Sequence, residues 1–248
     1  METLLVKNVG ELLNHTSVFD LLTEYTVFRG QSVRGNLLPG IARAYPNRDT
    51  TEGEKALLET LSRVGATRIA SQNNSQWDLL VLAQHYAMKT RLLDWTSNAL
   101  AALWFAYSGR VEGSAYVYAL NADSSMLRSV SEIDPFAISE TRLVQPRLSN
   151  DRIVAQNGWF TSHSFSEQAG RFVPLEEEFA NSTNLTEFVI PADYIKWMLV
   201  DLDRCGVNQS TLFPDLEGLC RYLNWKHVEP DALRSYWPIQ PLTEQGLR

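Results

Sequence analysis

The sequence predicts an α+β protein in one domain, and three observations support this prediction. Residues 25–31 combine β-branched and aromatic side chains, which is typical of a strand. Leucine and valine residues in 11–22 recur mostly at helical spacing instead. With 44% hydrophobic residues, the 248-residue chain can bury a substantial core. Because no internal repeat, low-complexity tract or clear linker interrupts it, we assign residues 1–248 to a single domain.

Six segments are predicted to be helical. Residues 51–70 carry acidic side chains early and arginines late, an order that complements the helix dipole. Alanine, leucine, tryptophan and phenylalanine dominate residues 98–108, so we expect that helix to be buried. The segments 195–202 and 216–223 place apolar residues at i, i+3, i+4 and i+7, which predicts two packing helices near the C-terminus. The remaining two helices are expected at 11–22 and 77–86.

Strands are expected at 25–31, 114–120, 151–160 and 186–190. Residues 114–120 alternate with period two, and Pro191 ends the last strand. Residues 88–96 should form a short extended segment that leads into the buried helix. The polar segments 121–150 and 165–184 are predicted to be irregular, the second with an exposed acidic face at Glu176, Glu177 and Glu178.

Composition excludes several classes of protein. A net charge of −7 and a pI near 5.2 argue against binding nucleic acid through a large basic surface, although they allow a local basic cleft. Cys205 and Cys220 lack zinc-ligand spacing, so we expect reduced thiols in the core of a cytoplasmic protein. No signal peptide is expected, and no apolar run approaches the roughly 20 residues of a membrane span. The predicted location is therefore the cytoplasm, without membrane binding.

Three separated segments resemble the FRG family, which is named after its Phe-Arg-Gly signature. The first is Phe-Arg-Gly-Gln at 28–31. The second and most specific runs from Gln-His-Tyr at 84–86 through Thr-Arg-Leu-Leu-Asp-Trp-Thr-Ser-Asn at 90–98 into 101–106. The third comprises Arg152, Gln156, Gly158 and Phe160, with a weaker echo at 212–216, so that the signature spans residues 25–222. Ala87 and Lys89 stand where the family usually has Gly and Pro, which predicts a differently shaped turn.

The order of these segments is also similar to that of ADP-ribosyltransferases of the Arg-Ser-Glu type. This resemblance implies a split mixed β-sheet core with flanking helices and NAD as a substrate. Arg29 would match the arginine of the first strand, and residues 94–97 would match the Ser-Thr-Ser segment. The catalytic glutamate has two candidate equivalents. The family signature favours Gln156, which carries no charge and would require a carboxylate from elsewhere, such as Glu178, or imply binding without turnover. The second candidate is Glu187, which lies three residues before Ile190-Pro191.

On this interpretation the predicted catalytic residues are Arg29, Thr96, Gln156 and Glu187. A planar guanidinium on a rigid strand suits the paired charges of a pyrophosphate. Gly30 would let the ligand approach the backbone, and Trp95 or Phe160 would stack on nicotinamide. No metal is required. The remaining predicted NAD contacts are Gln31, His85, Arg91 and Asn98.

Each of these polar residues could instead have a purely structural role. Arg29 or Arg91 could pair with a buried Asp94. Thr96 and Asn98 could cap the following helix. Gln31 could cap a turn, His85 could be a packed histidine, and Gln156 could belong to a hydrogen-bond network in the core.

The predicted function is transfer of ADP-ribose from NAD to an intracellular macromolecule, either a protein or a nucleic acid. Uncontrolled transfer would be toxic, and the resembled family is largely bacterial and phage-borne. We therefore expect a toxin or antiviral-defence effector with an antitoxin or another inhibitory protein as partner. Two further functions stay open: a non-catalytic module that binds a nucleotide or a partner, and a metal-independent nuclease that uses His85, Arg29 and Arg91.

Overall fold

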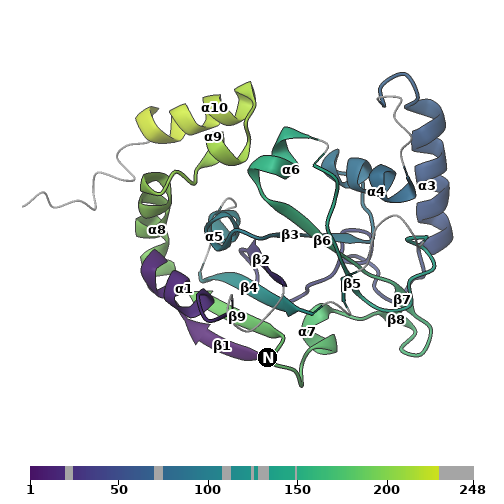
Figure 1. Ribbon diagram of the computed structural model, residues 1–248, viewed down its shortest axis with the longest axis horizontal. Helices are drawn as coiled ribbons and strands as arrows, with labels where there is room; N and C mark the ends of the chain where they lie inside the picture. The colour runs from purple at the N-terminus through teal and green to yellow at the C-terminus, as the bar shows by residue number, and fades with distance from the viewer. Residues whose placement is uncertain are drawn as a thin grey trace, which may run out of the picture.

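The computed structural model describes residues 1–19, 25–69, 75–107, 113–123, 126–127, 134–148 and 150–228. The described residues form a seven-stranded mixed sheet with the order β1-β9-β4-β2-β3-β6-β5 (Figure 1). β1 runs parallel to β9, and all remaining neighbours are antiparallel. The strands are β1 Glu2–Leu5, β2 Tyr25–Gln31, β3 Leu92–Thr96, β4 Ala115–Ala122, β5 Arg142–Val144, β6 Gly158–Ser162 and β9 Leu185–Ile190, with β7 Phe165–Ser166 and β8 Arg171–Phe172 in a separate ribbon.

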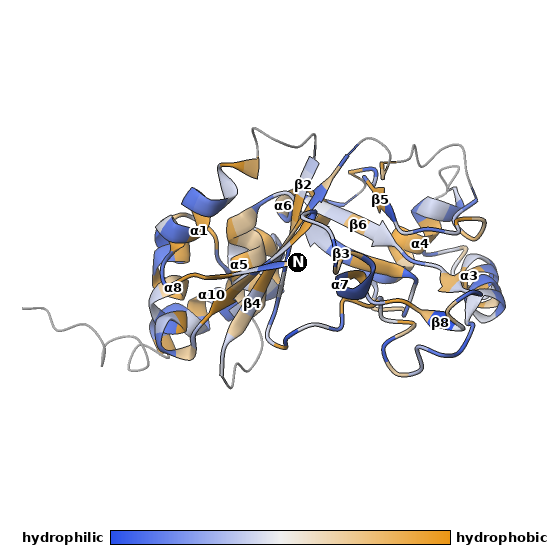
Figure 2. Ribbon diagram, turned by 90° about the horizontal axis from the view of Figure 1, so that it is seen from below, coloured by the Kyte–Doolittle hydropathy of each residue, from blue (hydrophilic) through white to orange (hydrophobic). Residues whose placement is uncertain are grey.

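Helices flank the sheet in two groups. α1, α5 and α8 lie beside β1, β9 and β4, whereas α3 and α4 lie at the opposite end of the molecule (Figure 1). In Figure 2, α5 and β4 near the centre are mainly apolar, while the outer helices α1, α3 and α8 carry polar faces. The helices are α1 Val9–Thr16, α3 Thr51–Val64, α4 Gln76–His85, α5 Ala99–Tyr107, α6 Asp151–Ala155, α7 Leu175–Glu178, α8 Ala192–Arg204, α9 Gln209–Leu212 and α10 Leu216–Leu223, followed by a π-helical turn at Asn224–Val228.

The sheet has a narrow junction between β2 and β3. β2 pairs with β4 along its whole length, from Tyr25↔Ala122 to Gln31↔Tyr116. In the described strands, β2 and β3 are joined through the single pair Phe28↔Thr96. The two strands then diverge, and β3 continues its pairing with β6. The sheet is therefore made of two parts, β1-β9-β4-β2 and β3-β6-β5, which meet at one residue pair.

Each part of the sheet has its own hydrophobic core. α5 packs on β2 and β4, where Phe28, Leu103 and Val117 belong to one cluster of buried residues. Leu80 of α4, Leu92 of β3 and further buried side chains form a second cluster at the opposite end of the sheet. A third cluster spans both parts, because it contains Val27 of β2 and Leu93 of β3. Burial of apolar surface, at roughly 25 cal/mol per Å², therefore stabilises each part and also joins the two.

Gly30 is the residue that lets α5 approach β2. A Cβ atom on Gly30 would lie 1.7 Å from the carbonyl oxygen of Ala102 and 2.6 Å from the amide nitrogen of Ala106. Both atoms belong to the α5 backbone, which cannot move aside without losing its packing. The missing side chain of Gly30 therefore serves helix packing, and Gly30 also lines the cavity in which it was predicted to let a ligand approach the backbone.

Most of the predicted elements are confirmed, and one strand prediction is wrong. Residues 151–160 fold as α6 followed by β6. Asn150 caps α6 by accepting a hydrogen bond from the Ile153 amide at 2.9 Å, and Asn157 adopts a positive φ of 47° that ends the helical turn. Gln156 is therefore the residue that ends a helix, not part of a strand.

Several shorter elements lie where loops were predicted. β5 lies within the predicted irregular segment 121–150, and β7, β8 and α7 lie within 165–184. β1 was not predicted; its four residues pair with β9 at the edge of the sheet. The ends of three predicted helices, at 20–22, 70 and 108, lie outside the described residues.

One prediction about side chains is corrected, and another is confirmed in part. Cys205, which follows α8, and Cys220 of α10 are free, as expected, but they are exposed and do not lie in the core. Glu176 accepts hydrogen bonds from the backbone amides of Asn36 and Leu37, and Glu178 accepts one from the Thr141 hydroxyl at 2.7 Å. Glu177 and Glu178 are exposed, as predicted, while Glu176 is half-buried.

Within the part of the chain that the structure describes, no helix is both long and apolar enough to cross a bilayer.

The packing of α5 against Gly30 gives a test of the fold. Gly30→Ala should lower the free energy of unfolding by about 3 kcal/mol or more, because the new methyl group would overlap backbone atoms. Gly53→Ala in α3 is the matched control, since nothing lies within 4 Å of a Cβ there, and helix propensity should stabilise it by about 0.5–1 kcal/mol. Urea unfolding followed by circular dichroism measures both. Similar stabilities for the two variants would contradict the packing described.

Candidate functional site

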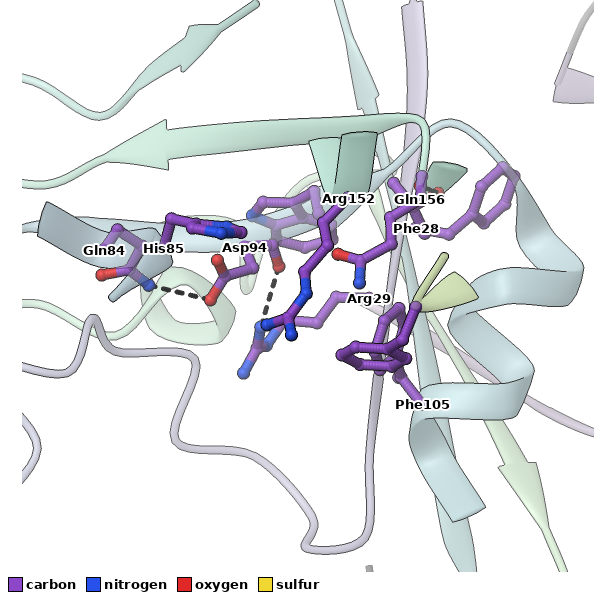
Figure 3. Close-up of a pocket in the computed structure, with 12 residues that line it drawn as sticks. Phe28, Arg29, Gln84, His85, Asp94, Phe105, Arg152 and Gln156 are labelled. Atoms are coloured by element: carbon purple, nitrogen blue, oxygen red, sulfur yellow. Dashed lines mark hydrogen bonds between the residues drawn. The ribbon is translucent and has the colours of Figure 1, made fainter. Parts of the chain in front are cut away.

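A cavity of 340 Å³ opens where β2 and β3 diverge. Its wall comes from both parts of the sheet, together with α4, α5, α6 and the turn after α9 (Figure 3). A smaller annex of 60 Å³ adjoins it and shares Gln84, His85, Asp94 and Gln156 among its lining residues. The main cavity is within the size range of small-molecule sites, about 300–1,000 Å³.

Arg29 projects from β2 into this cavity (Figure 3). Its Nη1 donates a 2.8 Å hydrogen bond to the main-chain carbonyl of Asp94, and its Nε donates to Gln31 at 3.2 Å. The first bond crosses the gap where β2 and β3 no longer pair. Burial lowers the pKa of Arg29 to about 10, and the nearby Asp94 carboxylate acts in the opposite direction. Arg29 is therefore still a cation at neutral pH.

Asp94 supplies a carboxylate to the same cavity. Its Oδ2 accepts a 2.9 Å hydrogen bond from the Gln84 side chain, whose oxygen accepts in turn from the Thr90 hydroxyl at 2.8 Å. The neighbours Leu93 and Trp95 are buried, while Asp94 is exposed. The sequence analysis allowed a buried Asp94 paired with an arginine, and the exposure of this carboxylate corrects that expectation.

Thr96 and Asn98 have the capping roles that the sequence allowed as structural explanations. The Asn98 Oδ1 accepts from the amides of Leu100 and Ala101 and so caps α5. The Thr96 hydroxyl donates to the Gln156 carbonyl at 2.6 Å and accepts from the Asn98 amide. Thr96 still lines the cavity, whereas Asn98 is not among the lining residues.

Gln156 and Phe160 reach the site from α6 and β6. Gln156 lines both the cavity and the annex, and its Nε2 donates to the Leu212 carbonyl at 3.0 Å. Phe160 lines the annex with Trp159 and further apolar residues. Trp95 lines both the cavity and the annex, although it is only 4% exposed and its indole donates to the Thr161 hydroxyl at 2.9 Å.

Comparison with known proteins adds a family to this geometry. Residues 24–114 match the family model of the FRG domain. Over these residues the chain is similar to the FRG domain. The match includes Arg29, His85, Asp94 and Thr96, and it ends before Arg152 and Gln156, which complete the cavity. No curated protein and no solved structure matches the chain.

Glu187 does not line the cavity between β2 and β3, which corrects its prediction as a catalytic residue. It stands on β9, separated from β2 by β4, and is 1% exposed. Its carboxylate accepts a hydrogen bond from Arg34 Nη2 at 2.7 Å. It accepts another from the Tyr118 hydroxyl at 2.9 Å. Burial raises the pKa of Glu187, but these hydrogen bonds outweigh burial and hold the pKa below its ordinary value. The Glu187 carboxylate is therefore charged and already paired with Arg34.

Arg91 is also directed away from the cavity. It is 1% exposed and donates to Glu54 at 2.8 Å, and its guanidinium lies 4.2 Å from the centre of the Phe136 ring. This pair ties β3 to α3, and it replaces both predicted roles of Arg91, phosphate binding and pairing with Asp94. Gln31 likewise acts within a turn, where its side chain donates to the carbonyls of Val33 and Gly35.

Sequence reasoning missed three residues that the fold brings to the site. Arg152 of α6 donates to Asp215 at 2.6 Å, and its guanidinium lies 5.3 Å from the centre of the Phe213 ring. Phe105 of α5 packs against Phe213 with ring centroids 6.2 Å apart. In Figure 3 the guanidinium groups of Arg152 and Arg29 both point into the cavity. Arg152 was noted as part of a signature, but nothing local marked it as a second cation of the same site.

His163 lies behind this site and was left unassigned by the sequence. It is 2% exposed, and its Nε2 is 2.9 Å from the Thr161 hydroxyl. The Thr161 hydroxyl also accepts a hydrogen bond from the Trp95 indole, and the Nδ1 of His163 is buried without a hydrogen-bond partner among the described residues. Burial, together with the charge of Arg29, lowers the pKa of His163 to about 3.

The buried imidazole predicts a loss of stability in acid. The pKa of His163 in the folded protein is below the value of about 6.5 in the unfolded chain, so the unfolded chain binds the proton first. This contribution to stability is complete above about pH 6.5 and is lost as the pH falls towards 3, by about 1.4 kcal/mol per pH unit. From pH 7 to 5, His163→Gln should therefore lose about 2 kcal/mol less than the unaltered protein in urea unfolding. Equal losses would contradict the neutral buried state, and His227→Ala serves as an exposed control.

Proposed function

We propose that this protein transfers ADP-ribose from NAD to a macromolecule of the cytoplasm. The observation that carries the proposal is the shared cavity between β2 and β3, which is faced by the cation of Arg29 and by the carboxylate of Asp94. A cation such as Arg29 can bind the phosphates of a dinucleotide. A carboxylate such as Asp94 can assist cleavage of its glycosidic bond.

Arg29 and Arg152 are suited to hold the pyrophosphate. Both guanidinium groups line the cavity, one from a strand and one from a short helix. Each is oriented by hydrogen bonds to the protein, Arg29 by a carbonyl and Arg152 by Asp215. Planar, permanently charged groups held in this way favour phosphate oxygens through paired hydrogen bonds.

The annex is suited to the nicotinamide ring. Val81, Ile153, Trp159 and Phe160 give it an apolar lining, and the amides of Gln84 and Gln156 stand among them. A flat heteroaromatic ring with a carboxamide needs this combination of apolar surface and few polar groups. Phe160 and Trp95, the two residues predicted to stack on nicotinamide, both line the annex.

In this proposal Asp94 is the catalytic carboxylate, the role that the sequence analysis predicted for Glu187. When the bond between the ribose and nicotinamide breaks, positive charge develops on the ribose, and a fixed carboxylate beside it stabilises that charge. The Gln84 hydrogen bond orients the Asp94 carboxylate. Gln156 would bind a ribose hydroxyl, and Thr96 would act indirectly by holding the Gln156 main chain at 2.6 Å.

The divided sheet also supports the proposal, because a split mixed sheet with a ligand cleft is what the transferase resemblance implies. The acceptor would be a protein or a nucleic acid. An effector of this kind, in toxin or antiviral-defence systems, would require an inhibitory protein partner.

A non-catalytic nucleotide-binding module is the second candidate. One observation favours it: the residue at the family-signature position beside the annex is the uncharged Gln156. A nuclease has less support, because Arg91, one of its three predicted residues, is held in the buried pair with Glu54.

Incubation with NAD labelled in its adenylate part, in the presence of cell extract, tests the proposal. Arg29→Ala should abolish both NAD binding and label transfer. Asp94→Asn should lower transfer by about 10²-fold or more, since it removes charge stabilisation in the transition state, and should change the NAD affinity much less. Glu187→Gln is the matched control and should retain transfer in its folded fraction. Full transfer by Asp94→Asn would contradict the role of Asp94. Arginine-dependent binding of NAD without transfer by the unaltered protein would identify a binding module.

A further inference from the structure

His85 stands at the junction between the cavity and the annex, and it lines both. It is the last residue of α4, and Gln84 beside it is fixed by its hydrogen bonds to Asp94 and Thr90. Among the described residues, neither nitrogen of the His85 imidazole has a hydrogen-bond partner. Its ring makes an edge contact with Tyr86, at 5.0 Å between ring centroids. A half-buried imidazole with free nitrogens is available to a ligand.

The surroundings of His85 favour its neutral form. Partial burial, and then the positive charge of Arg152, lower the pKa of His85 below its ordinary value. The charged groups that line the same cavity are Arg29 of β2, Asp94 of β3 and Arg152 of α6. The side chains from α5 and the turn after α9, Phe105 and Phe213, bring no charge. At neutral pH the imidazole can therefore accept a proton.

We propose that His85 is the general base that takes the proton from the acceptor nucleophile. The inference rests on the proposed function and deepens it. Asp94 and His85 line both the cavity and the annex, and they lie side by side in Figure 3. In this proposal the Asp94 carboxylate stabilises the positive charge on the ribose. The His85 imidazole accepts the proton of the nucleophile that attacks the ribose.

The step balances without a further reactant. The bond between C1′ of the ribose and the ring nitrogen of nicotinamide breaks, and its electron pair leaves with neutral nicotinamide. An acceptor oxygen or nitrogen forms the new bond to C1′. Its proton moves to a nitrogen of the His85 imidazole and from there to solvent.

A base in this position implies a class of acceptor. A carboxylate nucleophile has no proton to lose and gains nothing from a base. A hydroxyl or an N–H group must lose a proton as it attacks, so the acceptor group is an O–H or N–H group of a protein or nucleic acid.

Transfer of adenylate-labelled NAD to cell extract, measured from pH 5.5 to 8.5, tests the base. His85→Ala should lower the transfer rate by about 10²–10⁴-fold. The NAD dissociation constant, measured by calorimetry, should stay within about threefold. The rate of the unaltered protein should fall in acid as the imidazole is protonated, and the residual rate of the variant should lose that fall. Added imidazole should restore transfer to His85→Gly, an effect that a structural role would not produce. His227→Ala is the matched control, and His85→Asn replaces the alanine variant if the latter fails to fold.

Three results would overturn the proposal in different ways. If His85→Ala weakens NAD binding as much as it slows transfer, and the acid fall persists, His85 is a contact for NAD. If the unaltered protein transfers no label at any pH, the proposed function fails and the base fails with it. An active protein whose His85→Ala variant is equally active removes the base alone.

Discussion

The structure depends on the narrow junction at Phe28↔Thr96, where two parts of one sheet meet through a single residue pair of the described strands. Beyond that pair, β2 and β3 leave backbone groups without ladder partners, and such groups must be satisfied in another way. Arg29 satisfies one of them, because its guanidinium donates to the Asp94 carbonyl at 2.8 Å. The same arginine therefore holds the two parts at the junction and faces the space between them.

This dual position explains the electrostatics of the site. Arg29 of β2 and Arg152 of α6 both line the cavity. Each is oriented by a hydrogen bond that it donates to an oxygen atom of the protein. Two cations in one cavity are tolerated because Asp94 and Asp215 stand beside them. Burial lowers the pKa of Arg29 to about 10, which leaves its charge intact. The cavity is thus prepared for an anionic ligand, while its annex combines apolar side chains with polar ones.

Much of the site could be predicted from the sequence because its central segments are local. The strand 25–31 and the helix after residue 98 follow from short-range periodicity, whereas the exposure of Asp94 between buried residues does not. The assignment of residues 151–160 to a strand failed because the Asn150 cap and the positive φ of Asn157 outweighed the apolar pattern. Glu187 and Arg91 were misassigned because their partners, Arg34 and Glu54, are distant in sequence.

The sequence by itself determined the family signature, the main elements and the presence of Arg29 at the end of a strand, because these depend on neighbours within a few residues. Only the tertiary structure decided which charges are free and which are neutralised. Gly30 belongs to helix packing, Glu187 to an ion pair within the sheet, and Arg152 to the cavity. The physical reason is that the environment of a charged group is set by chain segments that meet only on folding, and burial and pairing follow from that meeting.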